Sequence, residues 1–326
     1  MFTTKANYLY VEPTSHCVLK CPRCPRTYSP ESYSPNHLDL NVYKDFIQSK
    51  YFGNLDYVEF GGNLGDPIYH PEIISFISVT QEALPSTKVV IHTNGTQGKR
   101  KWEDMVNQLR GIDIVLFSVD GLEQSNHHYR VNSNWELILE GMRISAKKCH
   151  TVWKYIVFSH NQHLIEEAIK LAKQLDIKTF LLTKSSVFNG DWLVDGIDPL
   201  APTANWQFNP SVDNFEKPTI SARCQNQSMH YLDSNGRYSP CCWINTDNNF
   251  CISASGPDFI EKTLNGEVLR NLKESWSSGS PHSICGRKCR DSSNNQKRSS
   301  HSQLEINLNQ EINVIRDMVE DFSRSS

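Results

Sequence analysis

The stretch that decides the fold is VEPTSHCVLKCPRCPR, residues 11–26, in which an apolar segment leads into a loop with three cysteines. Cys17, Cys21 and Cys24 have the spacing C-x3-C-x2-C and stand beside Pro, Lys and Arg, unlike cysteines that pack in a core. Three thiolates on one loop can hold three irons of a four-iron, four-sulfur cube and leave the fourth iron without a protein ligand. A structural zinc site takes four protein ligands, so zinc here would need a distant fourth cysteine.

The composition is that of an ordinary globular protein. The chain has 326 residues, 38% of them hydrophobic, and its 33 Lys and Arg against 36 Asp and Glu give a net charge of -3. This balance provides no general positive field for nucleic acid or an anionic membrane, so we expect neither as a partner. No export leader and no run of about 18 apolar residues is present, and we expect a cytoplasmic protein whose ten cysteines bind metal or pack as thiols.

Apolar runs alternate with segments of helical periodicity through the first 190 residues. We expect strands at residues 8–11, 57–60, 89–92, 112–117, 152–158 and 179–182. We expect helices at residues 42–49, 71–83, 101–109, 135–147 and 164–175, the fourth of them entered through Asn132 and Ser133 as N-caps. This alternation predicts an α/β fold with a parallel sheet, in which ligands bind at the carboxyl ends of the strands.

The polar loops follow the expected strands. The first strand leads into the three cysteines, and the second ends in EFGGNLGDPIYHP, residues 59–71. The third ends in HTNG, residues 92–95, and the fourth in FSVDG, residues 117–121. Because parallel strands place their carboxyl ends at one edge, these loops are the expected site.

On these residues the sequence resembles the radical S-adenosylmethionine (radical SAM) enzymes, whose cysteine motif has this spacing after a first strand. The resemblance implies that Cys17, Cys21 and Cys24 hold a 4Fe-4S cluster whose open iron is chelated by the methionine moiety of S-adenosylmethionine. It also implies reductive cleavage to a 5'-deoxyadenosyl radical and a partial (β/α)6 barrel over residues 1–190. Arg23 departs from the family, which usually carries an aromatic residue there, so we expect the adenine to be stacked differently.

The resemblance assigns part of the cosubstrate site to the loop after the second strand. LGDP, with Gly65 and Asp66, is similar to the family's glycine-rich turn near the methionine amino group. Asp66 stands for the usual Glu, or Asn63 does if the register is GGN. Gly-Asp-Pro is also ordinary loop chemistry, and its position after a strand is what favours the functional interpretation.

The loops after the fourth and fifth strands supply the remaining cosubstrate candidates. SVDGLEQSNHHYR, residues 118–130, resembles the family's Ser-x-Asp-Gly turn and following Arg. The resemblance implies that Ser118 meets the ribose and Arg130 the methionine carboxylate, with Asp120 in the turn and Asn161 as a further ribose candidate. The alternative for Arg130 is a surface salt bridge.

The last third has its own cysteine pattern. Cys224, Gly236 and Cys241 give C-x11-G-x4-C, and SMHYLDSNGRYSPCC, residues 228–242, predicts two short strands joined by an Asp-Ser-Asn-Gly turn. Cys285 and Cys289 form a C-x3-C pair after an expected helix near residues 260–276. Four Cys suit a zinc ribbon as well as iron and sulfur, but beside the upstream motif they resemble the twitch extension of radical SAM enzymes, which holds a second 4Fe-4S cluster. Cys242 competes with Cys241 as the ligand, Cys251 is an alternative to Cys285 or Cys289, and Cys149 is expected to pack at a helix end.

We therefore expect three parts: a radical SAM partial barrel (1–190), a twitch-like auxiliary-cluster domain (191–290), and a linker with a C-terminal amphipathic helix (291–326). The helix rests on an apolar stripe from Leu304 to Phe322 and is expected to dock on the protein's own barrel. The basic residues between Gly286 and Arg298 are interpreted as a solvated loop.

The expected function is hydrogen-atom abstraction from an unactivated C-H bond. An all-cysteine auxiliary cluster has no open iron and suits electron transfer, which favours net oxidation of a small-molecule or peptide substrate. An electron donor such as flavodoxin or ferredoxin is then a required partner. One alternative is a redox-neutral epimerase in which Cys242 or Cys251 returns a hydrogen atom. Another is a non-catalytic zinc or iron-sulfur module.

Overall fold

The computed structural model groups the chain into two compact units. Unit 1 comprises residues 1–17, 31–92 and 214–295, and unit 2 comprises residues 18–30, 93–213 and 296–326. In these ranges no described helix is long and apolar enough to cross a membrane. The structure describes residues 7–32, 34–49, 52–53, 55–184, 198–206, 229–242, 244, 252–254, 266–278, 280–283, 285 and 303–324.

Unit 1 is built on a sheet in which parallel and antiparallel pairs meet. Its strands are β1 (Tyr8–Val11), β2 (Tyr57–Phe60), β3 (Lys88–Thr93), β7 (Met229–Leu232), β8 (Arg237–Ser239) and β9 (Ile252–Ser253). β1 pairs in parallel with both β2 and β7, and β2 in parallel with β3. β8 is antiparallel to β7 and β9, which confirms the hairpin expected in the last third. The hairpin thus extends the sheet that begins with β1.

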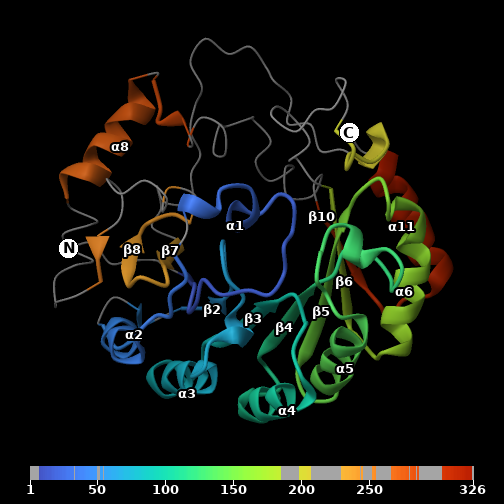
Figure 1. Ribbon diagram of the computed structural model, residues 1–326, viewed down its shortest axis with the longest axis horizontal. Helices are drawn as coiled ribbons and strands as arrows, with labels where there is room; N and C mark the ends of the chain where they lie inside the picture. The colour runs from blue at the N-terminus through green and yellow to red at the C-terminus, as the bar shows by residue number, and fades with distance from the viewer. Residues whose placement is uncertain are drawn as a thin grey trace. The chain divides into compact units, whose positions relative to one another are not determined.

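Helices cover one face of the unit 1 strands (Figure 1). They are α2 (Leu40–Ile47) and α3 (Ile73–Ala83); unit 1 also contains η3 (Pro67–Tyr69) and, later in the chain, α8 (Glu267–Ser277). α2 begins at Asp39, whose carboxylate accepts hydrogen bonds from two first-turn amides. Alternate strand residues are fully buried, and Phe60 packs on Tyr43 of α2 and Phe76 of α3 at centroid distances of 5.7 and 6.2 Å. In β1 and β2 the residues between the buried ones are half-buried, whereas Tyr231 of β7 is fully buried.

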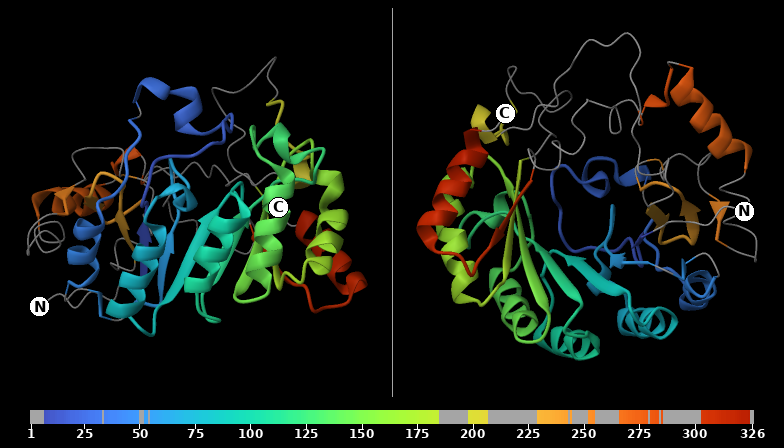
Figure 2. Two further views of the ribbon diagram at one scale, coloured as in Figure 1. Left: turned by 60° about the horizontal axis from the view of Figure 1, so that its bottom comes forward. Right: turned by 180° about the vertical axis from the view of Figure 1, so that it is seen from behind.

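Unit 2 carries the second series of strands and helices (Figure 2). β4 (Ile114–Ser118), β5 (His150–Val157) and β6 (Thr179–Lys184) pair in parallel in that order. The helices of the unit, with η1 at its boundary, are α1 (Pro25–Tyr28), η1 (Pro30–Ser32), α4 (Lys99–Gln108), η4 (Asn126–His128), α5 (Trp135–Ala146), η5 (Gln162–Leu164), α6 (Ile165–Gln174) and η6 (Ala204–Trp206). All six expected strands and the helices between them are present, which confirms the α/β class and the parallel pairing.

Close packing of α4 on α5 requires a glycine. A Cβ atom on Gly141 of α5 would lie 2.5 Å from the indole ring of Trp102, which is fully buried in α4 and stacks on Phe117. The expected N-caps of α5 were wrong. Asn134 caps it by accepting a hydrogen bond from the Leu137 amide, whereas Asn132 has a left-handed backbone with φ of 71°.

The C-terminal segment is a strand followed by a helix. β10 (Gln303–Asn307) pairs antiparallel with β6, so the part of the apolar stripe near Leu304 is not helical as expected. The observed burial has the period of a strand, with Ile306 fully buried between exposed neighbours. α11 (Ile312–Arg324) then packs on its own chain as expected, with the Phe322 ring 6.3 Å from Trp206 and 4.8 Å from the Lys184 ammonium.

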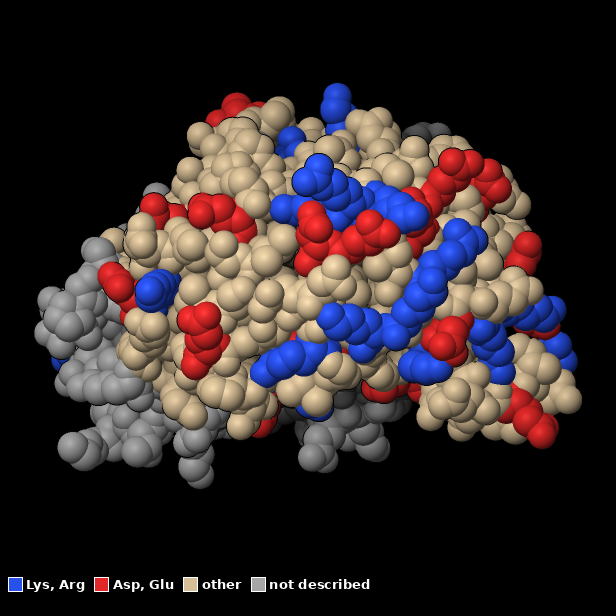
Figure 3. All heavy atoms as spheres, turned by 90° about the horizontal axis from the view of Figure 1, so that it is seen from below, with Lys and Arg blue, Asp and Glu red and all other residues tan. Residues whose placement is uncertain are grey.

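Charges on the helical surface are mixed in sign. Figure 3 shows basic and acidic side chains interspersed over the face that it displays. On unit 2, Lys99 lies 3.8 Å from both Glu103 of α4 and Glu140 of α5, and Arg100 lies 4.0 Å from Asp104. Such exposed pairs are each worth well under about 1 kcal/mol and are screened by salt. Of these three pairs only Lys99–Glu140 joins the two helices, so the pairs contribute little to holding α4 and α5 together.

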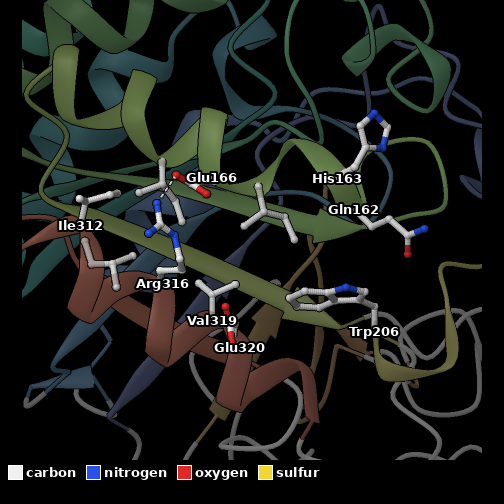
Figure 4. A pocket seen from close by; sticks show the side chains of 11 residues that line it. Gln162, His163, Glu166, Trp206, Ile312, Arg316, Val319 and Glu320 are labelled. Carbon is white, nitrogen blue, oxygen red and sulfur yellow. Dashed lines mark hydrogen bonds and ion pairs between the residues drawn. The ribbon is translucent and has the colours of Figure 1, made fainter.

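A cavity of about 230 Å³ lies where α11 meets α6 (Figure 4). Its apolar floor includes Ile169 and Ile315, and Trp206 lies at one end. At the rim an Arg316 Nη2 donates to Glu166 Oε1 at 2.7 Å, joining the two helices. Arg316, and then Lys170, lower the pKa of Glu166 from its usual 4.5 to about 2. The pair therefore favours the ionised carboxylate in the folded protein.

The Glu166–Arg316 pair predicts a pH effect of known sign. Because the folded pKa lies below the unfolded one, its contribution is present above pH 4.5 and is lost as the pH falls toward 2. We expect Glu166→Gln to lower the thermal unfolding midpoint slightly at pH 7, less so in high salt, and to match the wild type at low pH. Circular dichroism checks this, with Glu167→Gln on the same helix as the control. A difference that persists at low pH contradicts it.

Candidate functional site

In unit 1 the structure brings Asp66 to the first cysteine's segment. The Asp66 amide donates to the His16 carbonyl at 2.9 Å, and its side chain accepts from the Ile68 amide at 3.2 Å, capping η3. The negative charges of Asp66 and Cys17 both raise the pKa of the Tyr69 phenol, after burial, so the two groups face one ring. Of the two registers expected for this loop, this placement favours Asp66.

The glycine loop, residues 61–66, is packed so closely at Gly62 and Gly65 that neither position has room for a side chain. A Cβ atom on Gly65 would lie 1.8 Å from the Thr14 carbonyl oxygen, and one on Gly62 would lie 2.2 Å from the Gly65 oxygen. Glu12, immediately after β1, holds this loop by accepting from the amides of Leu64 and Gly65 at 2.7 and 2.9 Å. Sequence reasoning missed Glu12, although an acidic residue between a strand and the cysteine motif was the available signal.

In unit 2 Cys21 and Cys24 lie on one turn beside a buried cation. The Cys24 amide donates to the Cys21 carbonyl at 3.0 Å, and Cys21 is buried whereas Cys24 is half-buried. Burial raises the pKa of the Cys21 thiol, and the neighbouring Arg130 guanidinium opposes that shift. Arg130 in turn donates from Nε to Asp120 at 2.6 Å, with 16% of its side chain exposed. Arg130 is therefore not a surface salt bridge but lies between a carboxylate and a cysteine of the motif.

Asp120 is an anchor of this part of unit 2. Its side chain is fully buried, and beside the bond from Arg130 it accepts from the Ile156 amide at 2.8 Å. Its own amide donates to Asn126 Oδ1 at 2.8 Å. Asp120 thus ties the turn after β4 to β5 and to η4.

Asn161 serves the backbone of the same loops. Its Nδ2 donates to the carbonyls of Asp120 and Ile156, both at 2.9 Å, and its Oδ1 accepts from the Phe158 amide at 2.7 Å. Both donor hydrogens of the amide are therefore used inside the fold. Ser118, the other ribose candidate, is 8% exposed at the end of β4.

Arg23, the residue that departs from the family motif, makes a buried ion pair. Its Nη2 lies 2.5 Å from Asp198 Oδ1, and the two side chains are only 7% and 1% exposed. Asp198 also accepts from the Leu200 amide at 2.9 Å. The pair fastens the cysteine turn to the segment that follows β6, which explains why an arginine is suited to this position.

A cluster of aromatic rings and histidines follows β4 and β5. Tyr129 stacks on Phe158 at 4.4 Å, and His160 stacks on the other side of the cluster, 5.5 Å from Phe158. Burial, and then the proximity of His128, lower the pKa of His160 to about 4, so its ring is neutral near pH 7. No motif identified this cluster from the sequence.

The cysteines of the last third are described in part. Cys224, Cys251 and Cys289 lie outside the described residues, as do the loop at residues 286–298 and the linker up to residue 302. Cys285 is buried, and burial, with an added contribution from the Cys241 charge, raises the pKa of its thiol. Cys241 and Cys285, which come from the two separated halves of the expected ligand set, are therefore near enough within unit 1 for their charges to interact.

The three cysteines of the first loop are donors of the type that a 4Fe-4S cluster uses. None of the seven described cysteines is in a disulfide. Across the described ranges, no three His, Cys, Asp or Glu side chains are grouped as ligands of one metal ion. A cube binds each thiolate to a different iron, so its ligands stand further apart than those of one zinc ion. Cys149, in contrast, packs after α5 as expected, with its Sγ 3.3 Å from the Ser145 carbonyl.

The model of the Radical SAM superfamily matches residues 11–172. The chain carries a radical SAM domain. The superfamily implies S-adenosylmethionine and a 4Fe-4S cluster. A curated relative, the tungsten-containing aldehyde ferredoxin oxidoreductase cofactor-modifying protein of Pyrococcus furiosus, is 29% identical over 150 residues. These residues are 45% of this chain and 38% of that protein, so the match spans well under half of the relative.

Solved structures show the same fold over most of the chain. SuiB of Streptococcus suis bound to S-adenosylmethionine has a TM-score of 0.58 and 15% identity, covering 86% of this chain and 77% of that one. SuiB bound to the precursor peptide SuiA has a TM-score of 0.60 and 15% identity, and the match covers 86% of this chain and 76% of that one. Native anSMEcpe with bound AdoMet has a TM-score of 0.56 and 13% identity, and the match covers 81% of this chain and 82% of that one. The radical SAM domain therefore has the expected α/β architecture, with the open parallel sheet of a partial barrel.

The Asp120–Arg130 pair predicts a large stability effect. We expect Asp120→Ala to lower the free energy of unfolding by about 3 to 5 kcal/mol, because it leaves a buried guanidinium without its carboxylate. Denaturant unfolding of the metal-free protein measures this. Asp104→Ala, which removes an exposed pair in the same unit, is the control and should cost under about 1 kcal/mol. Equal effects of the two variants would mean that the buried pair is not a structural anchor.

Proposed function

We propose that the protein is a radical SAM oxidoreductase that abstracts a hydrogen atom from an unactivated C-H bond of a small-molecule or peptide substrate. The observation that carries this proposal is the C-x3-C-x2-C loop, together with the position of Arg130 beside Cys21 of that loop. Cys17, Cys21 and Cys24 hold the catalytic 4Fe-4S cluster. When bound, this cluster supplies the electron that cleaves S-adenosylmethionine to a 5'-deoxyadenosyl radical.

The residues of the strand-end loops hold the cosubstrate in this proposal. Asp66, Gly65 and Asn63 of unit 1 form the turn assigned to the methionine amino group. In unit 2 Arg130 has donors beyond the Nε that binds Asp120, and its planar fork suits a carboxylate. Ser118 and Asn161 remain the ribose candidates, although Asn161 contributes through the loop that it orders.

The auxiliary cluster of the proposal is held by Cys224, Cys241, Cys285 and Cys289 in a twitch-like domain over residues 191–290. Its support is the proximity of Cys241 and Cys285, which lie 44 positions apart by their numbers. A cluster held by these four cysteines would have no open iron and would provide an acceptor for the electron of the substrate radical; because the substrate would also release a proton, the net outcome would be oxidation. A reduced flavodoxin or ferredoxin supplies the first electron.

A peptide substrate has one further line of support. SuiB, whose fold this chain shares, was solved bound to its precursor peptide SuiA. The relative from P. furiosus is named as a cofactor-modifying protein, which keeps small molecules among the candidates. We propose both classes and assign neither to a particular residue.

A redox-neutral outcome is the second candidate, and one contact favours it. Asn63 Nδ2 donates to the Cys242 carbonyl at 3.1 Å, so this cysteine lies next to the loop assigned to S-adenosylmethionine. A thiol in that place can return a hydrogen atom to a substrate radical, which gives epimerisation without net oxidation.

The three-cysteine loop gives the first test of function. Replacing Cys17, Cys21 and Cys24 together by Ala should abolish 5'-deoxyadenosine formation and leave roughly four irons per chain, those of the second cluster. Anaerobic reconstitution, iron analysis and chromatography of the nucleoside measure this. Cys149→Ala, which removes a packing thiol, is the control and should retain cleavage. Cleavage by the triple variant at the wild-type rate would refute the assignment.

Cys241 and Cys242 separate the two candidate outcomes. If the outcome is oxidation, Cys241→Ala should remove the second cluster's visible absorption, retain uncoupled cleavage of S-adenosylmethionine and abolish product formation. Cys242→Ala should then retain the absorption, the cleavage and the product. Under epimerisation, Cys242→Ala should keep both clusters and yield product without inversion. Circular dichroism must first show that both variants fold, since a metal that joins distant segments also stabilises them. Loss of the cluster in Cys242→Ala alone would shift the ligand by one residue.

A further inference from the structure

Glu12 is a buried carboxylate whose hydrogen-bond donors are all neutral groups. The residue is 1% exposed and stands directly after β1, five positions before Cys17. One of its oxygens accepts from the Leu64 and Gly65 amides, and the other accepts from the Tyr231 hydroxyl at 2.8 Å. Burial raises the pKa of Glu12, and these three hydrogen bonds oppose the rise. A buried carboxylate is costly unless its donors are in place, so the three segments are held in one arrangement.

Tyr231 connects Glu12 by a hydrogen bond to the last third of the chain. It is fully buried on β7, and its ring stacks on Tyr10 with centroids 5.6 Å apart and planes at 19°. While its hydroxyl donates to Glu12, the same oxygen accepts from Asn63 Nδ2 at 3.3 Å. The other hydrogen of that amide reaches the Cys242 carbonyl at 3.1 Å. Asn63 belongs to the glycine loop, so the loop meets the Cys241–Cys242 turn through this side chain, and Glu12 and Tyr231 hold the loop in that position.

The glycine loop depends on this external support. Three of the residues between 61 and 66 are glycines, which have the greatest backbone freedom to lose on ordering. Within the loop, Gly65 fits against Thr14 only because it lacks a Cβ atom, so the loop has little room to adjust on that side. Any shift of the Leu64 and Gly65 amides must therefore move Glu12 or break its bonds.

We propose that Glu12 is a positioning residue that couples the glycine loop to the Cys241–Cys242 turn, so that a ligand bound at either one stabilises the arrangement of the other. The two ligands are those of the proposed function, on which this inference rests: S-adenosylmethionine binds at the glycine loop and a metal binds at the Cys241–Cys242 turn. The coupling is reciprocal, as equilibrium linkage requires. It makes the C-terminal third part of the cosubstrate site's support.

The test is hydrogen–deuterium exchange of two peptides, one covering residues 61–66 and one covering residues 240–242, with and without S-adenosylmethionine. In the reconstituted wild type, the ligand should slow exchange in both by about threefold or more, as expected if it strengthens a network of ordinary hydrogen bonds. Tyr231→Phe keeps the stacked ring and removes the hydroxyl. It should keep the effect at 61–66 and weaken it at 240–242, because Asn63 then bonds the Cys242 carbonyl without the support of the Tyr231 hydroxyl.

The matched control is Tyr238→Phe on the same hairpin. Tyr238 is also fully buried, but its hydroxyl bonds His230 on the helix-covered face, outside the network. This variant should retain the ligand effect in both peptides, even if it unfolds at a lower temperature. If Tyr231→Phe retains the full effect at 240–242, or Tyr238→Phe weakens it equally, the coupling is refuted.

A ligand-free comparison separates this inference from the proposed function. In the metal-free proteins, Tyr231→Phe should speed exchange at both peptides about 3- to 10-fold relative to Tyr238→Phe, the range of one lost hydrogen bond. Glu12→Ala should do the same where it folds. Should S-adenosylmethionine have no effect on the wild type while this difference is present, the ligand assignment fails and the positioning role stands. Equal exchange in the two tyrosine variants overturns the positioning role, whatever the ligand does.

Discussion

The need of buried carboxylates for hydrogen-bond donors organises the strand ends of both units. In unit 1 Glu12 collects donors from the glycine loop and from β7, and in unit 2 Asp120 collects them from Arg130 and β5. Each carboxylate stands at or just after the end of a strand and reaches segments that are remote in sequence. The loops that bear the candidate site residues are thereby fixed in unit 1 by Glu12, which is not a candidate for binding, and in unit 2 by Asp120, which is one.

The local features of the chain were predictable because they depend on short-range patterns. Apolar runs rich in β-branched and aromatic residues predicted all six strands of the first 190 residues, and Asp-Ser-Asn-Gly predicted the hairpin turn, where Gly236 has a positive φ of 69°. The cap of α5 was wrong because three consecutive polar residues, 132–134, compete for the position. The stripe near Leu304 was wrong because a spacing of four fits both a helix face and one side of a strand.

The partners of the site residues were not predictable, because they are set by tertiary packing. The ion pair of Arg23 joins two residues that are 175 positions apart in the sequence, and the hydrogen bond from Tyr231 to Glu12 joins two that are 219 positions apart. The sequence placed Arg23 as an exception to a motif, but only the buried Asp198 explains the exception. Asn161 likewise lies where a ligand residue was expected, yet its amide is used to order the loop after β5. Residue type and position identified the site, whereas the division of labour within it required coordinates.

The parallel pairing of β7 with β1 has a consequence for how the cysteine-rich last third relates to the rest of unit 1. Because the register places Tyr231 opposite Tyr10, the hydroxyl of Tyr231 comes within reach of the residue that follows β1. An antiparallel or separate domain would leave Glu12 with two donors and an unsatisfied oxygen in a buried place, at a cost of about 1 to 3 kcal/mol. The hairpin thus completes the hydrogen bonding of the first loop. The hairpin is consequently a structural component of the strand end of unit 1, and the Cys241–Cys242 turn that follows it has to be considered together with the glycine loop rather than apart from it.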